Sequence, residues 1–143
     1  MSIKDRYLAY AEAFEQTYAD DDWSRIGPYF TEDAVYEGGP EVARGRDAVL
    51  AMLKGSVDSM DRNMDSRTPD FAPPTVDGDT LSMNWTVTYS KSGCPDLQIS
   101  GREFAEFRGD QIALLRDEFS PEAQQALESW MAEHGHKLAP GSA

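Results

Sequence analysis

The sequence predicts one α+β domain in which N-terminal helices pack on a curved, mainly antiparallel sheet. Three observations support this prediction. Helical periodicity dominates the first 63 residues, alternating strand patterns follow up to residue 119, and no repeat, linker or low-complexity segment divides the 143 residues. A chain of this length can bury its own core, and a curved sheet wrapped over a helix leaves a cone-shaped cavity. We expect a core over residues 6–120, a helix over 120–135 and a frayed tail.

The first predicted element is an amphipathic helix over residues 3–20. Its inner face is largely aromatic, with residues at helical spacing: Tyr7, Tyr10, Ala11, Phe14 and Tyr18. Asp22 can cap a short second helix from Trp23, which Gly27-Pro28 loosens and which ends at Thr31-Glu32-Asp33. A brief strand over 34–37 and a third helix from Arg46 to about Asn63 complete this half.

The second half predicts strands. Residues 65–76 contain Pro69, Pro73 and Pro74, so this segment is expected at a sheet edge or as irregular chain. Asp77-Gly78 predicts a hairpin turn. Strands over 81–90, 97–107 and 111–119 then form an antiparallel meander. Ser120-Pro121-Glu122 predicts the start of the final helix.

The composition excludes several classes of partner and cofactor. Asp and Glu outnumber Lys and Arg by 26 to 13 without any basic run, so nucleic acid and anionic membranes are poor partners. The N-terminus has no signal-like apolar segment, so we expect a cytoplasmic protein. His134-Gly135-His136 lacks further ligands at suitable spacing, so we predict no metal. No phosphate-binding or dinucleotide motif occurs, so any reaction should be cofactor-free.

Asp117 is the strongest candidate for a catalytic residue. Strand alternation places Ala113, Leu115, Asp117 and Phe119 on one face, with Ile112, Leu114 and Arg116 on the other. A carboxylate among apolar neighbours and without an adjacent cation should have a raised pKa suited to acid or base work. The other interpretation, equally open, is that Asp117 only bonds a neighbouring strand, helix end or Tyr hydroxyl.

Three segments carry a resemblance to a known family. These are Tyr29 to Glu37 (YFTEDAVYE), Gly45 to Val49 (GRDAV) and Ile112 to Phe119 (IALLRDEF). In their order and spacing they resemble the SnoaL-like branch of the nuclear-transport-factor-like superfamily. The resemblance covers residues 6–120 and implies a cone-shaped barrel, frequently dimeric through the outer sheet face. Families with this fold include polyketide cyclases, ketosteroid isomerases, limonene-type epoxide hydrolases and non-catalytic binders, so the fold alone does not choose a function.

The resemblance also implies roles for particular residues. In polyketide cyclases and limonene-type epoxide hydrolases, the position that matches Asp117 holds the catalytic acid. Ketosteroid isomerases have an Asp base where this chain has Gly38, and an oxyanion-hole Tyr where it has Phe14, which argues against their mechanism. Of the epoxide hydrolase set only Tyr36 and Asp117 are retained. The middle strand, Met83 to Val87, lacks the Arg and the second Asp of that set, and Gly38 replaces the water-positioning Asn.

Further candidates for the site are residues expected to lie near Asp117 or on the walls of the cavity. Glu103 lies on the strand next to Asp117 and could share acid and base roles with it, although an exposed strand Glu, with the register shifted by Gly101, is the stronger alternative. The predicted pocket walls are Phe14, Tyr18, Tyr36, Trp85, Val87, Tyr89 and Leu115. Each of these could equally be plain core.

Two functions remain open from the sequence. One is an acid–base enzyme of the cyclase, isomerase or hydrolase kind acting on a polyketide-, steroid- or terpenoid-like substrate. The other is a non-catalytic module that binds a small apolar ligand or a partner protein. Ile112 and Leu114, expected on the outer sheet face, motivate a homodimer.

Overall fold

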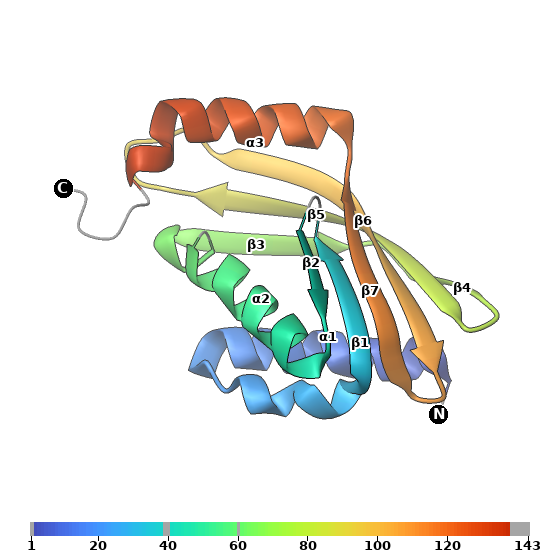
Figure 1. Cartoon of the computed structure of the whole chain (residues 1–143). Helices are drawn as coiled ribbons and strands as arrows, with labels where there is room; N and C mark the ends of the chain where they lie inside the picture. Colours follow the sequence, from blue (N-terminus) through green and yellow to red (C-terminus); the bar gives the residue numbers. More distant parts are fainter. Residues whose placement is uncertain (1, 39–40, 60, 138–143) are drawn as a thin grey trace.

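The computed structural model describes residues 2–38, 41–59 and 61–137, and one open sheet organises them (Figure 1). The strands follow the order β2-β1-β7-β6-β5-β3, and β4 pairs with the N-terminal end of β5. Only the β1–β7 pair is parallel among the described strand pairs. The strands are β1 (Phe30–Gly38), β2 (Glu41–Arg44), β3 (Ser66–Phe71), β4 (Thr75–Asp77), β5 (Thr80–Ser90), β6 (Leu97–Arg108) and β7 (Gln111–Phe119). The predicted α+β fold with a mainly antiparallel sheet is confirmed.

Within the described residues, three α-helices and four short 3₁₀ segments accompany the sheet. The α-helices are α1 (Ile3–Asp20), α2 (Arg46–Ser59) and α3 (Pro121–His134), and the 3₁₀ segments are η1 (Trp23–Arg25), η2 (Gly27–Tyr29), η3 (Asp61–Asn63) and η4 (Gly135–Lys137). Ser120 caps α3 as predicted, because its hydroxyl accepts the amide hydrogen of Ala123 at 3.0 Å. The frayed tail was predicted after Gly135; η4 occupies its first residues, and residues 138–143 lie outside the described residues.

Three local predictions need correction. Asp22 makes no side-chain cap to η1; its carboxylate accepts the Ser24 hydroxyl instead. Thr31 to Asp33 do not end a helix, since Pro28 confines the helical segment to η2 and β1 already begins at Phe30. The predicted third helix ends at Ser59, and a separate turn, η3, follows.

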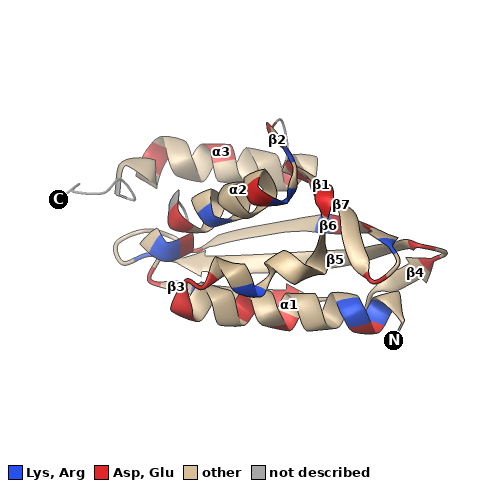
Figure 2. Cartoon of the chain, turned by 60° about the horizontal axis from the view of Figure 1, so that its bottom comes forward, with Lys and Arg blue, Asp and Glu red and all other residues tan. Residues whose placement is uncertain are grey.

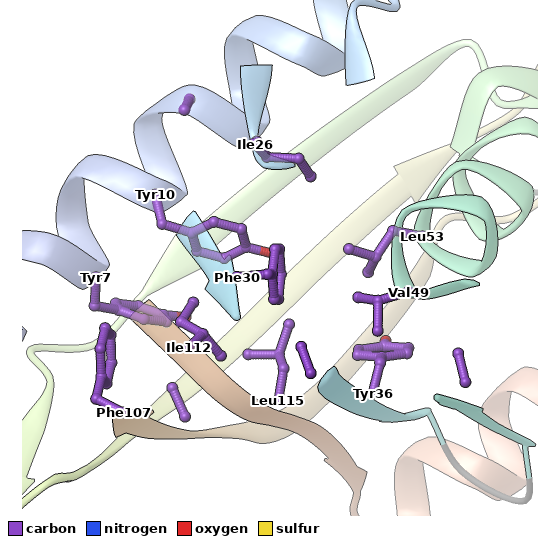
Figure 3. Close-up of a cluster of buried hydrophobic side chains, with 14 of the residues drawn as sticks. Tyr7, Tyr10, Ile26, Phe30, Tyr36, Val49, Leu53, Phe107, Ile112 and Leu115 are labelled. Atoms are coloured by element: carbon purple, nitrogen blue, oxygen red, sulfur yellow. The ribbon is translucent and has the colours of Figure 1, made fainter. Parts of the chain in front are cut away.

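The hydrophobic core is divided into two clusters on the inner face of the sheet. The larger cluster joins α1 and α2 to β1, β5, β6 and β7, and Figure 3 shows its centre around Tyr10, Phe30 and Leu115. The smaller cluster joins α3, through Ala123 and Trp130, to the other end of β5 and β6. The two clusters leave space between them, and a cavity lies there.

The last strand contains an irregularity that changes which residues face inward. Glu106 pairs with Leu114 but Phe107 pairs with Ile112, so Ala113 is an extra residue in β7. Ile112 is therefore fully buried beside Tyr7 and Phe107 (Figure 3). The prediction that Ile112 lies on the outer face is wrong, and a homodimer stays a prediction that rests on Leu114.

Asp and Glu residues occur along α1, α2 and α3 (Figure 2). No helix among the described residues is long and apolar enough to cross a membrane.

Candidate functional site

The cavity of about 360 Å³ lies between α1, α2 and the inner face of β5, β6 and β7. Its volume is in the range of pockets that enclose small organic molecules. Apolar and aromatic side chains form most of its wall, and α3 contributes Leu127 at one end. Two groups of polar side chains face into it.

The first group is a pair of carboxyls, Glu103 on β6 and Asp117 on β7. The two residues are direct partners in the antiparallel register of these strands, and both side chains reach the cavity. Because directly opposed side chains stand about 5 Å apart at Cβ, the two carboxyls come within hydrogen-bonding reach of each other. Gly101 does not shift the register of β6, so Glu103 faces inward.

Two tyrosines hold this carboxyl pair. The Tyr7 hydroxyl donates a hydrogen bond to Glu103 Oε1, and the Tyr36 hydroxyl donates to Asp117 Oδ2 at 2.6 Å. Burial raises the pKa of both tyrosines, so their hydroxyls stay protonated and act as donors. Tyr7 comes from α1 and Tyr36 from β1, so the pair is clamped from two sides.

The carboxyl pair holds a proton on Glu103. Burial raises the pKa of the Glu103 carboxyl well above its usual range, and the facing Asp117 carboxylate adds to the rise. The hydrogen bond from Tyr7 acts in the opposite direction but is the smallest of these effects. The raised pKa favours the protonated, neutral form of the Glu103 carboxyl next to Asp117.

The second polar group, the Arg67 cluster, consists of Glu15, Asp61, Arg67 and Tyr89. Arg67 makes a two-pronged contact with Glu15, at 2.8 and 3.3 Å, and its Nε lies 3.0 Å from Asp61 Oδ2. The Tyr89 hydroxyl donates to Asp61 Oδ1 at 3.1 Å. Burial raises the pKa of Asp61, while Arg67 and Tyr89 oppose the rise. The cluster ties α1, η3, β3 and β5 together at one end of the cavity.

An aromatic wall separates the two polar groups. Trp85 on β5 pairs with Gly101, and its ring lies so close that a Cβ at Gly101 would come within 2.5 Å of it. The absence of a side chain at Gly101 thus lets the indole lie across β6. Phe119 meets the indole edge to face, with ring centroids 5.5 Å apart.

Most of the predicted site residues line the cavity. They are Phe14, Tyr36, Trp85, Val87, Tyr89, Glu103 and Asp117. Leu115 does not line it, because it is packed into the larger core cluster with 1% of its surface exposed. Tyr18 does not line it either; its hydroxyl donates to the Asp61 carbonyl at 3.3 Å, and its ring packs beside Arg67.

Sequence reasoning missed the roles of Tyr7 and of three members of the Arg67 cluster: Glu15, Asp61 and Arg67. Tyr7 lies seven positions before Phe14 and therefore on the same helical face, so helical periodicity could have placed Tyr7 in the site. The Arg67 cluster joins residues up to 74 positions apart, from Glu15 to Tyr89, and no local pattern signals it. No group of three or more His, Cys, Asp or Glu that could hold a metal occurs within residues 2–38, 41–59 and 61–137.

Solved structures match the chain along most of its length at low sequence identity. TerC, co-crystallised with polyporic acid, is 11% identical with a TM-score of 0.68, over 92% of this chain and 99% of TerC. A putative polyketide cyclase from Xanthomonas campestris pv. campestris is 17% identical with a TM-score of 0.60, over 96% of this chain and 100% of the cyclase chain. A hypothetical protein with a ketosteroid isomerase-like fold from Catenulispora acidiphila, in complex with trimethylamine, is 16% identical with a TM-score of 0.63. The match covers 88% of this chain and 92% of that protein. At such identities these matches show the fold alone.

The family is shown by a sequence model. No curated protein matches the chain at a significant level. The model of the SnoaL-like domain, in contrast, matches residues 10–115, which is most of the chain. This match agrees with the sheet, the helices and the cavity described above. The chain therefore belongs to the SnoaL-like domain family.

Proposed function

We propose that the chain is a cofactor-free acid–base enzyme that acts on a small, mainly apolar molecule held in the cavity. The observation that carries this proposal is the opposition of Glu103 and Asp117 on adjacent strands inside the cavity. Two carboxyls in such a place cannot both ionise at low cost, so one of them holds a proton. One acid and one base side by side are what a proton transfer needs.

The chemistry assigns a role to each member of the pair. Glu103, the protonated carboxyl, donates its proton to an oxygen or an unsaturated carbon of the substrate. Asp117 accepts a proton from a substrate carbon or from an attacking water. The hydrogen bond between the two carboxyls then returns the proton to Glu103, so that no proton is gained or lost over a turnover. Isomerisation, cyclisation and hydration each require one proton given and one taken, so all three are compatible with this pair.

The tyrosines keep the pair in position. Tyr36 fixes the Asp117 carboxylate and Tyr7 fixes Glu103, so neither carboxyl has to be reoriented during the reaction. Both tyrosines are positioning residues in this proposal, because their hydroxyls already donate to carboxyls.

Two simple probes test the proposal. Hydration of 1-methylcyclohexene oxide, followed by gas chromatography, reports on hydrolase chemistry, and deuterium exchange at the α-carbons of 2-tetralone, followed by NMR, reports on isomerase or cyclase chemistry. We expect acceleration over buffer with one probe, and a loss of at least about 100-fold in both Glu103→Gln and Asp117→Asn. Glu118→Gln is the matched control, because Glu118 lies next to Asp117 on the exposed side of β7.

A second function is favoured by a different observation. Gly38, rather than a carboxylate or an amide, lines the cavity beside Tyr36, and both carboxyls already have tyrosine partners. These features fit a non-catalytic module that binds a small ligand. If both probes react at the buffer rate while ligands bind wild type and Asp117→Asn equally well, this second function replaces the first.

A further inference from the structure

The charged residues that line the cavity are strongly unbalanced. Among the described residues, Arg67 is the only basic side chain on its wall. The acidic residues on the wall are Glu15, Glu41, Asp61, Glu103 and Asp117. When Glu103 holds its proton, four carboxylates face one guanidinium, so the lining carries a net charge of −3. A negative potential of this kind attracts cations and repels anions.

The one guanidinium offers little to an anionic ligand. Its terminal nitrogens contact Glu15 at 2.8 and 3.3 Å, and its Nε faces Asp61 at 3.0 Å. The Arg67 side chain is only 10% exposed, so it is not free to turn toward a ligand. Arg67 therefore offsets charge within its own cluster and leaves the carboxyl pair without a cation.

The hydrogen-bond donors on the wall are also largely committed. The hydroxyls of Tyr7, Tyr36 and Tyr89 already donate to carboxyls. Trp85 Nε1 is buried without a hydrogen-bond partner, and it has no accessible surface to present to a ligand. The polar groups that remain for a ligand at the pair are mainly carboxyl oxygens, which accept hydrogen bonds from a cation.

The apolar part of the wall favours the same kind of ligand. Tyr10, Phe14, Trp85 and Phe119 all line the cavity. The faces of aromatic rings carry partial negative charge and attract ammonium groups, most strongly at Trp and when water is excluded. Aromatic faces next to carboxyls that lack a counter-ion stabilise an organic cation without any specific hydrogen-bond pattern.

We infer that the cavity takes an organic cation, a ring-containing amine or quaternary ammonium whose charged nitrogen lies against the carboxyl pair and whose ring packs on Trp85. The pair is the binding point because Arg67 already provides a counter-ion to Glu15 and Asp61, whereas no basic side chain among the described residues forms an ion pair with Glu103 or Asp117. This inference deepens the proposed function by naming a substrate class, and it rests on that proposal in taking the cavity as the substrate site.

Three probes of similar size and different charge test the inference. Benzyltrimethylammonium carries a permanent charge, neopentylbenzene has the same shape with carbon in place of nitrogen, and 3-phenylpropionate is an anion. Their binding to the full chain at pH 7 is measured by ligand-observed NMR titration. We expect the cation to bind at least about tenfold more tightly than neopentylbenzene, with no binding of the anion.

Two variants locate the bound charge. Asp117→Asn removes a charge from the pair and should reduce the preference for the cation by about tenfold. Glu118→Gln removes one charge from the exposed side of the same strand and should leave the preference unchanged. An equal loss in both variants overturns the inference, because the preference would then reflect the overall charge of the chain.

The remaining outcomes separate this inference from the proposed function. Equal or tighter binding of neopentylbenzene overturns the inference but not the acid–base proposal, since an apolar ligand would still occupy the cavity. Absence of cation binding overturns it as well. The acid–base proposal fails separately, through unchanged rates with the epoxide and the ketone.

Discussion

Two groups of carboxyl residues line the same cavity, and they differ in how their charge is compensated. In the Arg67 cluster, two carboxyls face one guanidinium, and the side chains of Asp61 and Arg67 are only 14% and 10% exposed. In the carboxyl pair, Glu103 and Asp117 face each other with tyrosine hydroxyls as their donors. Burial raises the pKa of a carboxyl in both groups, but an arginine opposes the rise only in the first.

This difference separates a structural role from a chemical one. The Arg67 cluster joins four elements through charge-assisted contacts, so its ionised form stabilises the fold. The carboxyl pair gains no such compensation, and it keeps a proton that can be transferred. The comparison implies that loss of charge should have opposite effects on stability in the two groups.

The largest effect is expected from Arg67→Met. The substitution keeps an apolar stem of similar length but leaves Asp61, whose side chain is 14% exposed, without its counter-ion. Glu15 loses the same partner but is 38% exposed, so water compensates its charge. Removal of one partner from a buried ion pair costs about 3–5 kcal/mol. We expect a loss of this size in the free energy of unfolding, measured by urea denaturation at pH 7.

Arg108→Met is the matched control for this prediction. Arg108 pairs with Asp33 on the surface, where their side chains are 64% and 68% exposed. Water and ions screen such a pair, so its loss should cost under about 1 kcal/mol. Similar losses for both substitutions would show that the Arg67 cluster is no more important to the fold than a surface ion pair.

The second prediction concerns Glu103→Gln, whose effect should have the opposite sign. The Glu103 pKa is raised in the folded chain, so between the unfolded and folded pKa values the folded chain binds more protons than the unfolded chain. The contribution of Glu103 to stability therefore falls as pH rises through that interval. Glu103→Gln removes this dependence, so the variant should gain stability relative to wild type, by up to about 1.4 kcal/mol per pH unit above the ordinary pKa of Glu.

Urea denaturation of both proteins from pH 5 to pH 8 measures this gain. The difference between the two proteins is the relevant quantity, because other carboxyls such as Asp20 and Asp33 have lowered pKa values and change wild type and variant alike. A difference that is constant with pH would mean that Glu103 is not held in its protonated form.

The fold was largely predictable because its signals are local. Aromatic residues at helical spacing placed α1, alternation placed β5 to β7, and Pro69 placed β3 at an edge. The errors arose where local signals compete. Phe30 lies at helical spacing after Trp23 and Ile26, so the pattern predicts a helix there although Phe30 begins β1. The extra residue Ala113 turns Ile112 to the inner face of β7, and no Gly or Pro in the sequence signals this bulge.

The site was predictable only where it follows one strand. Alternation from Leu115 to Phe119 placed Asp117 on the inner face, and the structure agrees. Glu103 was harder to place, because its role depends on its register with Asp117 across two strands. Asp61 and Arg67 lie on η3 and on the edge strand β3, and their contacts depend on how α1 crosses the sheet. The match to the family model also ends at residue 115, so it covers neither Asp117 nor α3.

The third prediction compares the tyrosine of each group. Tyr36 donates to Asp117 at 2.6 Å, where no arginine shares the charge, whereas Tyr89 donates at 3.1 Å to Asp61, which Arg67 also contacts. Tyr36→Phe should therefore cost about 2 kcal/mol of unfolding free energy and Tyr89→Phe about 1 kcal/mol. Tyr36→Phe should also reduce turnover of the reactive probe, while Tyr89→Phe should not. Equal costs in stability and rate would remove the distinction between the two groups.

The smallest effect is expected from Arg116→Gln, which tests whether the pair truly lacks a counter-ion. Arg116 is adjacent to Asp117 in sequence, but strand alternation turns it to the outer face, where it contacts Glu37 at 2.9 Å. The two side chains are 39% and 35% exposed, so the loss of their contact should cost under about 1 kcal/mol. The stability gain of Glu103→Gln with rising pH should be the same in the Arg116→Gln background. A larger gain in that background would mean that Arg116 compensates the pair through the sheet, and the inferred preference for a cationic ligand would then lose its electrostatic basis.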